Sequence, residues 1–142
     1  MSVSPDVIVR EWFQQVWNER SEAAIDRIMA PGARVHGLAD GVIDGPEGFK
    51  PFYRALCSAF DNLKVEVVQT VVEGGRVAAL CHVTGVHAGD GLGGKATGRA
   101  IDFWGTTIAR VEGGLIVEGW NTFDFLRMYQ QVGWVKSPMV GP

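Results

Sequence analysis

The stretch Leu63-Lys64-Val65-Glu66-Val67 marks a change in the periodicity of the chain. Apolar and charged residues alternate strictly here, which is typical of a β-strand with one buried and one exposed face. β-Branched residues stay frequent up to Val72, so a strand is expected over residues 63–72. The residues before this point follow the period of a helix instead, and the fold class depends on this switch.

Three more strands are expected downstream of the switch. Gly74-Gly75 is typical of a hairpin turn, and a glycine-rich connection covers residues 89–98. A short terminal helix is expected over residues 124–131, before Gly133. Consecutive strands with short connections predict an antiparallel meander. These strands are expected over residues 76–86, 99–111 and 115–123.

The first 60 residues predict three helices. Pro5 suits the first position of a helix, Ser21 can cap a second helix, and Pro31-Gly32 is expected to end it. Residues 34–45 are expected to hold a short extended piece with a turn at Ala39-Asp40-Gly41. Apolar residues recur at helical spacing in each segment: Val9, Trp12, Phe13 and Val16, then Ile25, Ile28 and Met29, then Phe49, Phe52, Tyr53, Leu56 and Phe60.

This order of elements predicts an α+β fold. A curved antiparallel sheet, made of a four-strand meander and one short strand, would wrap on three N-terminal helices, with a short C-terminal helix at the end. The length of 142 residues fits a single domain over residues 1–142. Because β and α units do not alternate, a doubly wound nucleotide-binding fold is not expected.

Composition excludes several classes of partner. The chain has 13 basic and 16 acidic residues and no run of Lys or Arg, so a nucleic-acid partner is not expected. Its apolar stretches are far shorter than the ~20 residues of a membrane span, and its N-terminus lacks the pattern of a secretory signal. Cys57 and Cys81 lie singly within apolar patterns, as buried thiols do, so the cytoplasm is the expected compartment.

No cofactor or metal is expected either. The glycine-rich segment 89–95 lacks the Gly-Lys-Ser/Thr ending of a phosphate loop and follows a meander strand, which favours a loop at a pocket rim. His36, His82 and His87 lack the spacing of a helical metal site, and no cysteine pair supports zinc.

Four motifs resemble one known family. They are Ala59-Phe60-Asp61, Gly85-Val86-His87-Ala88-Gly89, Ala96-Thr97-Gly98-Arg99, and the run 114–124 closed by Gln130-Gln131-Val132-Gly133. They are similar to the SnoaL-like polyketide cyclases and ester cyclases. That family belongs to the cone-shaped superfamily of ketosteroid isomerase, scytalone dehydratase and the nuclear transport factors. The likeness covers nearly the whole chain and implies the same cone fold.

The resemblance implies a small-molecule acid/base enzyme that closes a hydrophobic carbonyl compound by an intramolecular aldol step, without a cofactor. In the cyclases the acid/base is a carboxylate at the end of the last strand, and Asp124 occupies the matching position. His36 matches a position where the cyclases carry a pocket histidine. Asp124 can equally be the N-cap of the terminal helix, and a lone histidine is more often structural.

Asp102 is a third catalytic candidate, on physical grounds. It lies in Ala100-Ile101-Asp102-Phe103-Trp104, where both faces of the strand are otherwise apolar. A carboxylate there is costly unless it is paired or protonated, which is typical of a pocket acid with a perturbed pKa. The alternative is a bulge or a sheet edge that leaves Asp102 in water. Trp104 shares its face.

Further residues are candidates for contact with a substrate. Asn121 could donate a hydrogen bond to a substrate carbonyl, whereas Trp120 points to the opposite face. His87 lies in a glycine-rich turn, where it could face the pocket or be structural. Aromatic side chains would form the pocket wall, and the candidates are Trp17, Phe52, Tyr53 and Trp104.

Two classes of function remain open: a cyclase or isomerase, and a non-catalytic ligand-binding or dimerisation module of the same fold. Convergence of Asp102, Asp124 and His36 in one closed cavity would favour the enzyme, and their dispersal the module. Apolar residues on both faces of the strands, such as Ile101 and Trp104, also predict a homodimer formed through the outer face of the sheet.

Overall fold

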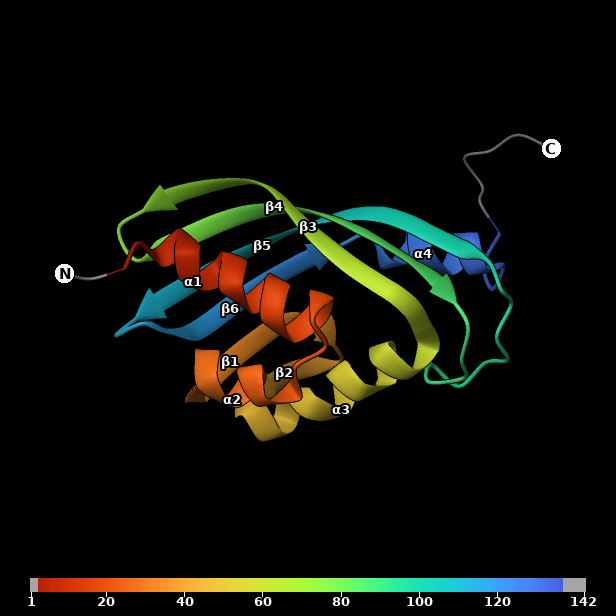
Figure 1. The fold of residues 1–142 in the computed structure, drawn as a ribbon, viewed down its shortest axis with the longest axis horizontal. Helices are drawn as coiled ribbons and strands as arrows, with labels where there is room; N and C mark the ends of the chain where they lie inside the picture. Colours follow the sequence, from red (N-terminus) through yellow and green to blue (C-terminus); the bar gives the residue numbers. More distant parts are fainter. Residues whose placement is uncertain (1–2, 137–142) are drawn as a thin grey trace.

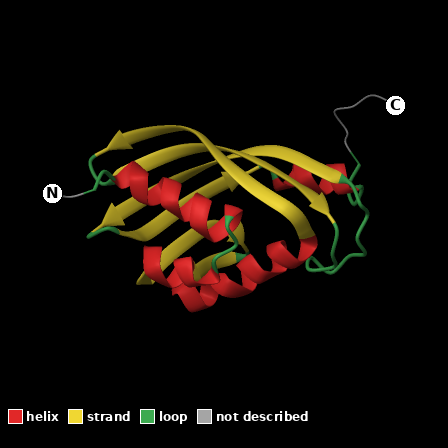
Figure 2. Cartoon of the chain, viewed as in Figure 1, coloured by secondary structure: helices red, strands yellow, loops and turns green. Residues whose placement is uncertain are grey.

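The computed structural model describes residues 3–136 and has α+β architecture (Figure 1). Its helices cover the concave face of one sheet, except for the last, which lies at one end of it (Figure 2). The elements, in chain order, are α1 (Pro5–Glu11), the π-helical segment η1 (Trp12–Asn18), α2 (Glu22–Ile28), β1 (Met29–Ala39), β2 (Gly41–Asp44), α3 (Gly45–Ala59), β3 (Phe60–Glu73), β4 (Arg76–His87), β5 (Ala100–Glu112), β6 (Leu115–Phe123) and α4 (Phe125–Val132).

The strands form one sheet in the order β2-β1-β6-β5-β4-β3. Strands β3 to β6 pair antiparallel in sequence order, so the predicted α+β cone with a four-strand meander is confirmed. The predicted short extended piece is instead the two strands β1 and β2, and β1 pairs parallel to β6. The sheet is therefore mixed rather than wholly antiparallel.

The end of the second helix differs from its prediction. The helix ends at Ile28, and Pro31-Gly32 lie inside β1 rather than terminating the helix. Pairing of β1 with β2 begins only at Arg34, and its register with β6 shifts between Met29 and Arg34. A proline, which cannot donate a ladder hydrogen bond, is tolerated where pairing is interrupted in this way. The expected cap is present, because the Ser21 side chain accepts a hydrogen bond from the Ala24 N–H.

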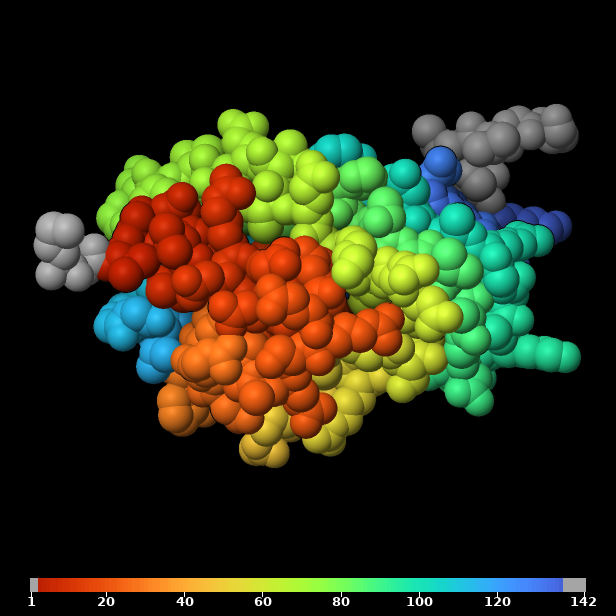
Figure 3. Space-filling view, viewed as in Figure 1, coloured from red at the N-terminus to blue at the C-terminus, as the bar shows by residue number. Residues whose placement is uncertain are grey.

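The first helix widens after Glu11. In η1 the Glu19 N–H donates to the Gln14 carbonyl, a bond across five residues. Four apolar side chains of this segment are buried: Trp12, Phe13, Val16 and Trp17. In the space-filling view the N-terminal helices, red to orange, cover the concave side of the sheet (Figure 3).

Strict alternation in β5 sets the two faces of the sheet. Ile101, Phe103 and Thr107 are buried on the inner face, whereas Asp102 and Trp104 are exposed on the outer face. The inner face packs on the helices and encloses the site described below. Within residues 3–136, no helix combines the length and the apolar character that a membrane crossing requires.

Candidate functional site

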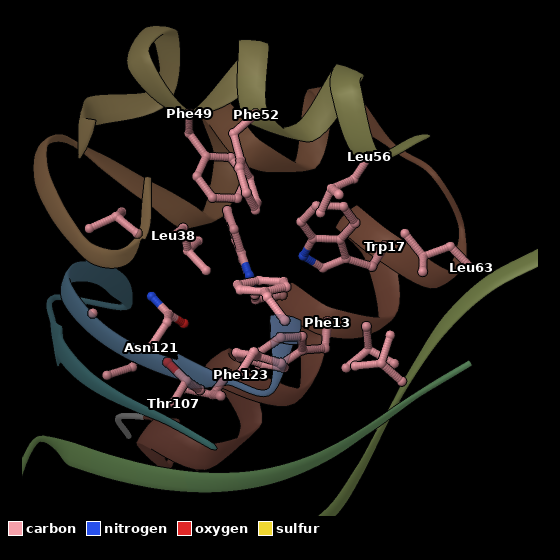
Figure 4. Close-up of a pocket in the computed structure, with 18 of the residues that line it drawn as sticks. Phe13, Trp17, Leu38, Phe49, Phe52, Leu56, Leu63, Thr107, Asn121 and Phe123 are labelled. Carbon is pink, nitrogen blue, oxygen red and sulfur yellow. The ribbon is translucent and has the colours of Figure 1, made fainter. Parts of the chain in front are cut away.

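A cavity of about 90 Å³ lies between the inner face of the sheet and the helices (Figure 4). Every element except α2 and β2 contributes to its wall, which is overwhelmingly apolar. Its lining residues are Val9, Trp12, Phe13, Trp17, Met29, Val35, Leu38, Phe49, Phe52, Leu56, Phe60, Leu63, Val65, Val83, Ile101, Phe103, Thr107, Ala109, Ile116, Gly119, Asn121, Phe123, Phe125 and Met128.

The cavity exists because small residues face large ones. Ala109 and Gly119 leave the inner face of β5 and β6 open, while aromatic side chains from η1 and α3 form the opposite wall. A Cβ placed on Gly119 would find no atom nearer than 3.8 Å. At Gly105, by contrast, a Cβ would lie 2.1 Å from the ring of Phe123, so that part of the inner face is filled.

Polar groups reach this apolar space from two sides. Thr107 and Asn121 are opposite each other in the register of β5 and β6. The indole nitrogen of Trp17 points toward the cavity from the other side (Figure 4). Among the hydrogen bonds within residues 3–136, none involves the Thr107 hydroxyl, the Trp17 indole or the Asn121 Oδ1.

The Asn121 amide has a fixed orientation. Its Nδ2 donates to the backbone carbonyl of His36 at 3.0 Å. A carbonyl only accepts, so the nitrogen must be the atom on that side, and Oδ1 faces the cavity (Figure 4). The expectation that Asn121 donates to a substrate carbonyl is therefore corrected: Asn121 presents an acceptor.

Asp102 lies outside the cavity, on the outer face of β5. Its side chain is 64% exposed, and its Oδ1 lies 2.6 Å from Nε2 of His82. The prediction that it lies in the pocket is wrong, because Ile101 and Phe103 take the inward positions of the strand. Trp104 is likewise not a wall residue, since it is 47% exposed and stacks on the His82 ring at 4.5 Å. Apolar residues on the outer face made both faces look buried in the sequence.

Asp124 is the N-cap of α4. Its Oδ1 accepts a hydrogen bond from the Arg127 N–H at 3.0 Å, and the residue is exposed. It does not line the cavity. Asp124 is therefore a helix cap, as the alternative interpretation of the sequence proposed. The expectation that its carboxylate lies in a closed cavity is wrong.

His36 also faces outward. Its Nε2 lies 2.8 Å from Oε2 of Glu118, and its ring stacks on Trp120 with 11° between the planes. The hydrogen bond from His36, and after it that from Arg110, lowers the pKa of Glu118 below the usual value. The side chain expected in the pocket therefore belongs to a surface pair, and only the backbone carbonyl of His36 supports the cavity.

Of the described residues that line this cavity, none has a titratable side chain. The three predicted catalytic residues are dispersed over the outer surface instead of converging within it. The candidate site is thus an apolar chamber with hydrogen-bonding groups on two of its walls.

The family model of the SnoaL-like polyketide cyclases matches residues 7–132. The chain belongs to this family. Membership supports a cyclase-type role, and the cone fold expected from the sequence motifs agrees with it. No curated protein matches the chain.

Solved structures share the fold. The chain is similar to a candidate SnoaL-like polyketide cyclase from Jannaschia sp. CCS1, with 24% identity, a TM-score of 0.83, and coverage of 94% of this chain and 93% of that one. IdmH from Streptomyces antibioticus, a candidate polyketide cyclase, is 25% identical with a TM-score of 0.80 and coverage of 92% and 99%. A ketosteroid isomerase-like protein from Catenulispora acidiphila shares the fold at 17% identity, with a TM-score of 0.77 and coverage of 94% and 96%.

The remaining predicted residues of this SnoaL-like protein fall into two groups. Trp17 and Phe52 line the cavity. Tyr53 lies behind the wall, where it packs on Trp17 with ring centres 5.1 Å apart, and burial raises its pKa to about 12. His87 is fully buried beside the glycine-rich connection, where its Nδ1 accepts from the Thr97 N–H at 3.2 Å, and it does not line the cavity.

Sequence reasoning missed Thr107 as a cavity residue. Its signal was present, since Thr107 alternates with the outward Thr106 in the phase of Ile101 and Phe103. Within residues 3–136, no group of three or more His, Cys, Asp or Glu side chains could hold a metal ion.

Proposed function

We propose that this protein binds a neutral, hydrophobic carbonyl compound in its cone cavity. The observation that carries the proposal is the chemistry of the wall, which combines aromatic side chains with unpaired hydrogen-bonding groups and no charge. A charged ligand would be buried there without a partner, which is strongly unfavourable. A neutral compound with a few oxygens satisfies both the apolar surface and the polar groups.

We propose further that the protein acts on such a compound as a cyclase by orienting it. A cavity that holds a chain folded brings its reacting carbons together, which alone accelerates a reaction. When an enol closes on a carbonyl, the enol electron pair forms the C–C bond and the enol proton ends on the carbonyl oxygen. The closure thus needs no added proton. The Trp17 N–H and the Thr107 hydroxyl are donors available to stabilise an oxygen that gains charge.

The second candidate is a ligand-binding module without catalysis. The dispersal of Asp102, Asp124 and His36 to the surface favours it, because none of them can exchange a proton with a ligand in the cavity. Both candidates require the same ligand in the same place, and turnover distinguishes them.

An experiment with a synthetic aryl triketone tests both. Calorimetry measures its binding, and chromatography measures its cyclisation above the rate in buffer. Ala109→Leu fills the cavity and should weaken binding at least tenfold, whereas Thr106→Val on the outer face should leave binding unchanged. Cyclisation with a rate independent of pH from 5.5 to 8.5 supports orientation, and binding alone supports the module. Equal binding to the wild type and the filled variant would contradict the cavity as the site.

We also propose a homodimer formed through the outer face of the sheet, without a nucleic-acid or membrane partner, in the cytoplasm. Leu80, Trp104 and Ile108 are 37%, 47% and 44% exposed on that face. Such patches on a sheet are typical of association surfaces, and a stable one buries ~800 Å² on each partner. Sedimentation should give a dimer at micromolar concentration, and Ile108→Asp should give a monomer. A monomeric wild type would refute the proposal.

A further inference from the structure

We infer that Asn121 and Thr107 form a subsite for a hydroxyl group on the ligand. The cavity would then prefer a phenol or an enol to a compound whose oxygens are all carbonyl or ether oxygens. This inference rests on the proposed function, because it names the ligand chemistry of the same cavity.

The acceptor of the subsite is Oδ1 of Asn121. Donation from Nδ2 to the His36 carbonyl at 3.0 Å fixes the amide, so that it cannot turn its donor to the ligand without losing that bond. Of the described residues, none donates to Oδ1. An amide oxygen in apolar surroundings needs a donor, and the ligand is the available source.

Asn121 is also held from the side of its backbone. Gly37 follows His36 in β1 and adopts a φ of +88°, and a Cβ there would lie 2.0 Å from the Asn121 carbonyl oxygen. This close approach presses β1 against β6 at the residue that carries the acceptor. The acceptor is therefore positioned before a ligand arrives, which reduces the entropy lost on binding.

Thr107 completes the subsite. It is the direct partner of Asn121 across the β5–β6 ladder and is 5% exposed. Side chains of directly opposed residues on one face lie ~5 Å apart at their Cβ atoms, so one ligand atom can contact both. The threonine hydroxyl can donate as well as accept.

A ligand hydroxyl satisfies both groups at once. It donates its proton to Asn121 Oδ1 and accepts the proton of the Thr107 hydroxyl. An ether or a carbonyl oxygen accepts from Thr107 but leaves Oδ1 unpaired in the apolar chamber. A site that presents an acceptor to a hydroxyl disfavours such an analogue, because the acceptor then stays unpaired beside the apolar ligand.

A matched pair of ligands tests this inference by calorimetry: 2-naphthol and 2-methoxynaphthalene. They differ only in that a methyl group replaces the hydroxyl proton, and both are neutral at pH 7. Wild-type protein should bind 2-naphthol about tenfold tighter, as expected when the ligand supplies the donor that Oδ1 lacks. Asn121→Leu should reduce the ratio to less than about threefold while 2-methoxynaphthalene keeps its affinity. Thr107→Val should weaken the binding of both compounds, because each accepts from the threonine hydroxyl. Thr106→Val, the same change on the outward neighbour, should leave both affinities at the wild-type values.

The outcomes separate the two proposals. Equal affinity of the wild type for the two naphthalenes would overturn the hydroxyl subsite and leave the cavity as a binding site. Binding of neither compound would overturn the proposed function itself. Asn121→Leu also removes the bond to His36, so circular dichroism must show that it folds. If it does not fold, the nearly isosteric Thr107→Val decides, and an unchanged affinity of that variant for both compounds overturns the subsite.

Discussion

The two faces of the sheet carry opposite chemistry. On the inner face of β5 and β6, Thr107 and Asn121 are the polar side chains of an uncharged cavity wall. On the outer face, two clusters each combine a histidine stacked on a tryptophan with a carboxylate bound to the imidazole. They consist of His82, Trp104 and Asp102, and of His36, Trp120 and Glu118.

This contrast bears on the reaction. Acid/base chemistry needs a titratable group within reach of the substrate, and the candidate groups are used in pairs at the surface or in a helix cap. The inner face offers shape and hydrogen bonds instead. In this SnoaL-like protein the cavity and the His36–Glu118 and His82–Asp102 pairs lie on opposite faces of the sheet.

The largest loss of stability is expected from a charge placed on the inner face of the sheet. Ile101→Asp buries a carboxylate on the inner face, where the residue is 2% exposed, and should lower the free energy of unfolding by about 4 kcal/mol or more. Ile108→Asp, at a residue 44% exposed on the outer face, should cost the monomer less than about 1 kcal/mol. Urea unfolding at low protein concentration measures both. Similar losses of unfolding free energy in the two variants would contradict the difference between the inner and outer faces.

A smaller loss of stability is expected from a substitution where β1 packs against β6. Gly37→Ala places a Cβ 2.0 Å from the Asn121 carbonyl oxygen at a φ of +88°, so it should cost about 3 kcal/mol. Gly119→Ala is the matched control, because its Cβ enters open space with no atom nearer than 3.8 Å. Its stability should stay within about 1 kcal/mol of the wild type. Thermal unfolding compares them, and a tolerated Gly37→Ala would contradict the rigid placement of Asn121.

The periodicity of the sequence predicted most of the fold. The segment 115–123 matches β6, because glycine turns before it and Asp124 after it end the pattern on both sides. The C-terminal end of α2 and the length of β1 could not be predicted in this way. Pro31-Gly32 usually stop a helix, but here β1 continues through them, since pairing with β2 starts only at Arg34.

The site was less accessible to sequence reasoning. Alternation shows that Asp102 and Ile101 lie on opposite faces, but not which face meets the helices. Ile108 and Trp104 made the outer face look buried, and that misplaced Asp102. The orientation of Asn121 depends on a carbonyl 85 residues away in the chain, at His36, and no local pattern encodes it.

A loss of about 1 kcal/mol is expected when the cap of α4 is removed. Asp124→Ala deletes the acceptor for the Arg127 N–H, whereas Asp124→Asn retains one, so the second variant should stay within a few tenths of a kcal/mol of the wild type. Both should bind the cavity ligand as the wild type does. Urea unfolding and calorimetry measure these quantities. Loss of binding or turnover in Asp124→Asn, with stability retained, would show that Asp124 belongs to the active site.

Cys81 should have no effect on the pH dependence of stability near neutrality and a measurable one in alkali. Burial raises the pKa of its thiol from 9.0 to about 12. Between these values the folded protein keeps a proton that the unfolded chain releases, so stability falls as pH rises from 9 toward 12 and is unaffected below 9. Melting temperatures from pH 7 to 10.5 should fall less steeply in Cys81→Ala. The same slope in both proteins would show that the inner face does not shield this thiol.

The indole N–H signals of the five tryptophans test the central claim most directly. Trp12 and Trp17 line the cavity, whereas Trp104 and Trp120 stack on histidines outside it. Two-dimensional ¹H–¹⁵N NMR spectra recorded during a titration with 2-naphthol show which indoles sense the ligand. Large shifts of the Trp12 and Trp17 signals, with Trp104 and Trp120 unchanged, are the predicted result. Shifts confined to Trp104 and Trp120 would place the ligand on the outer face, among the titratable residues, and would contradict the account.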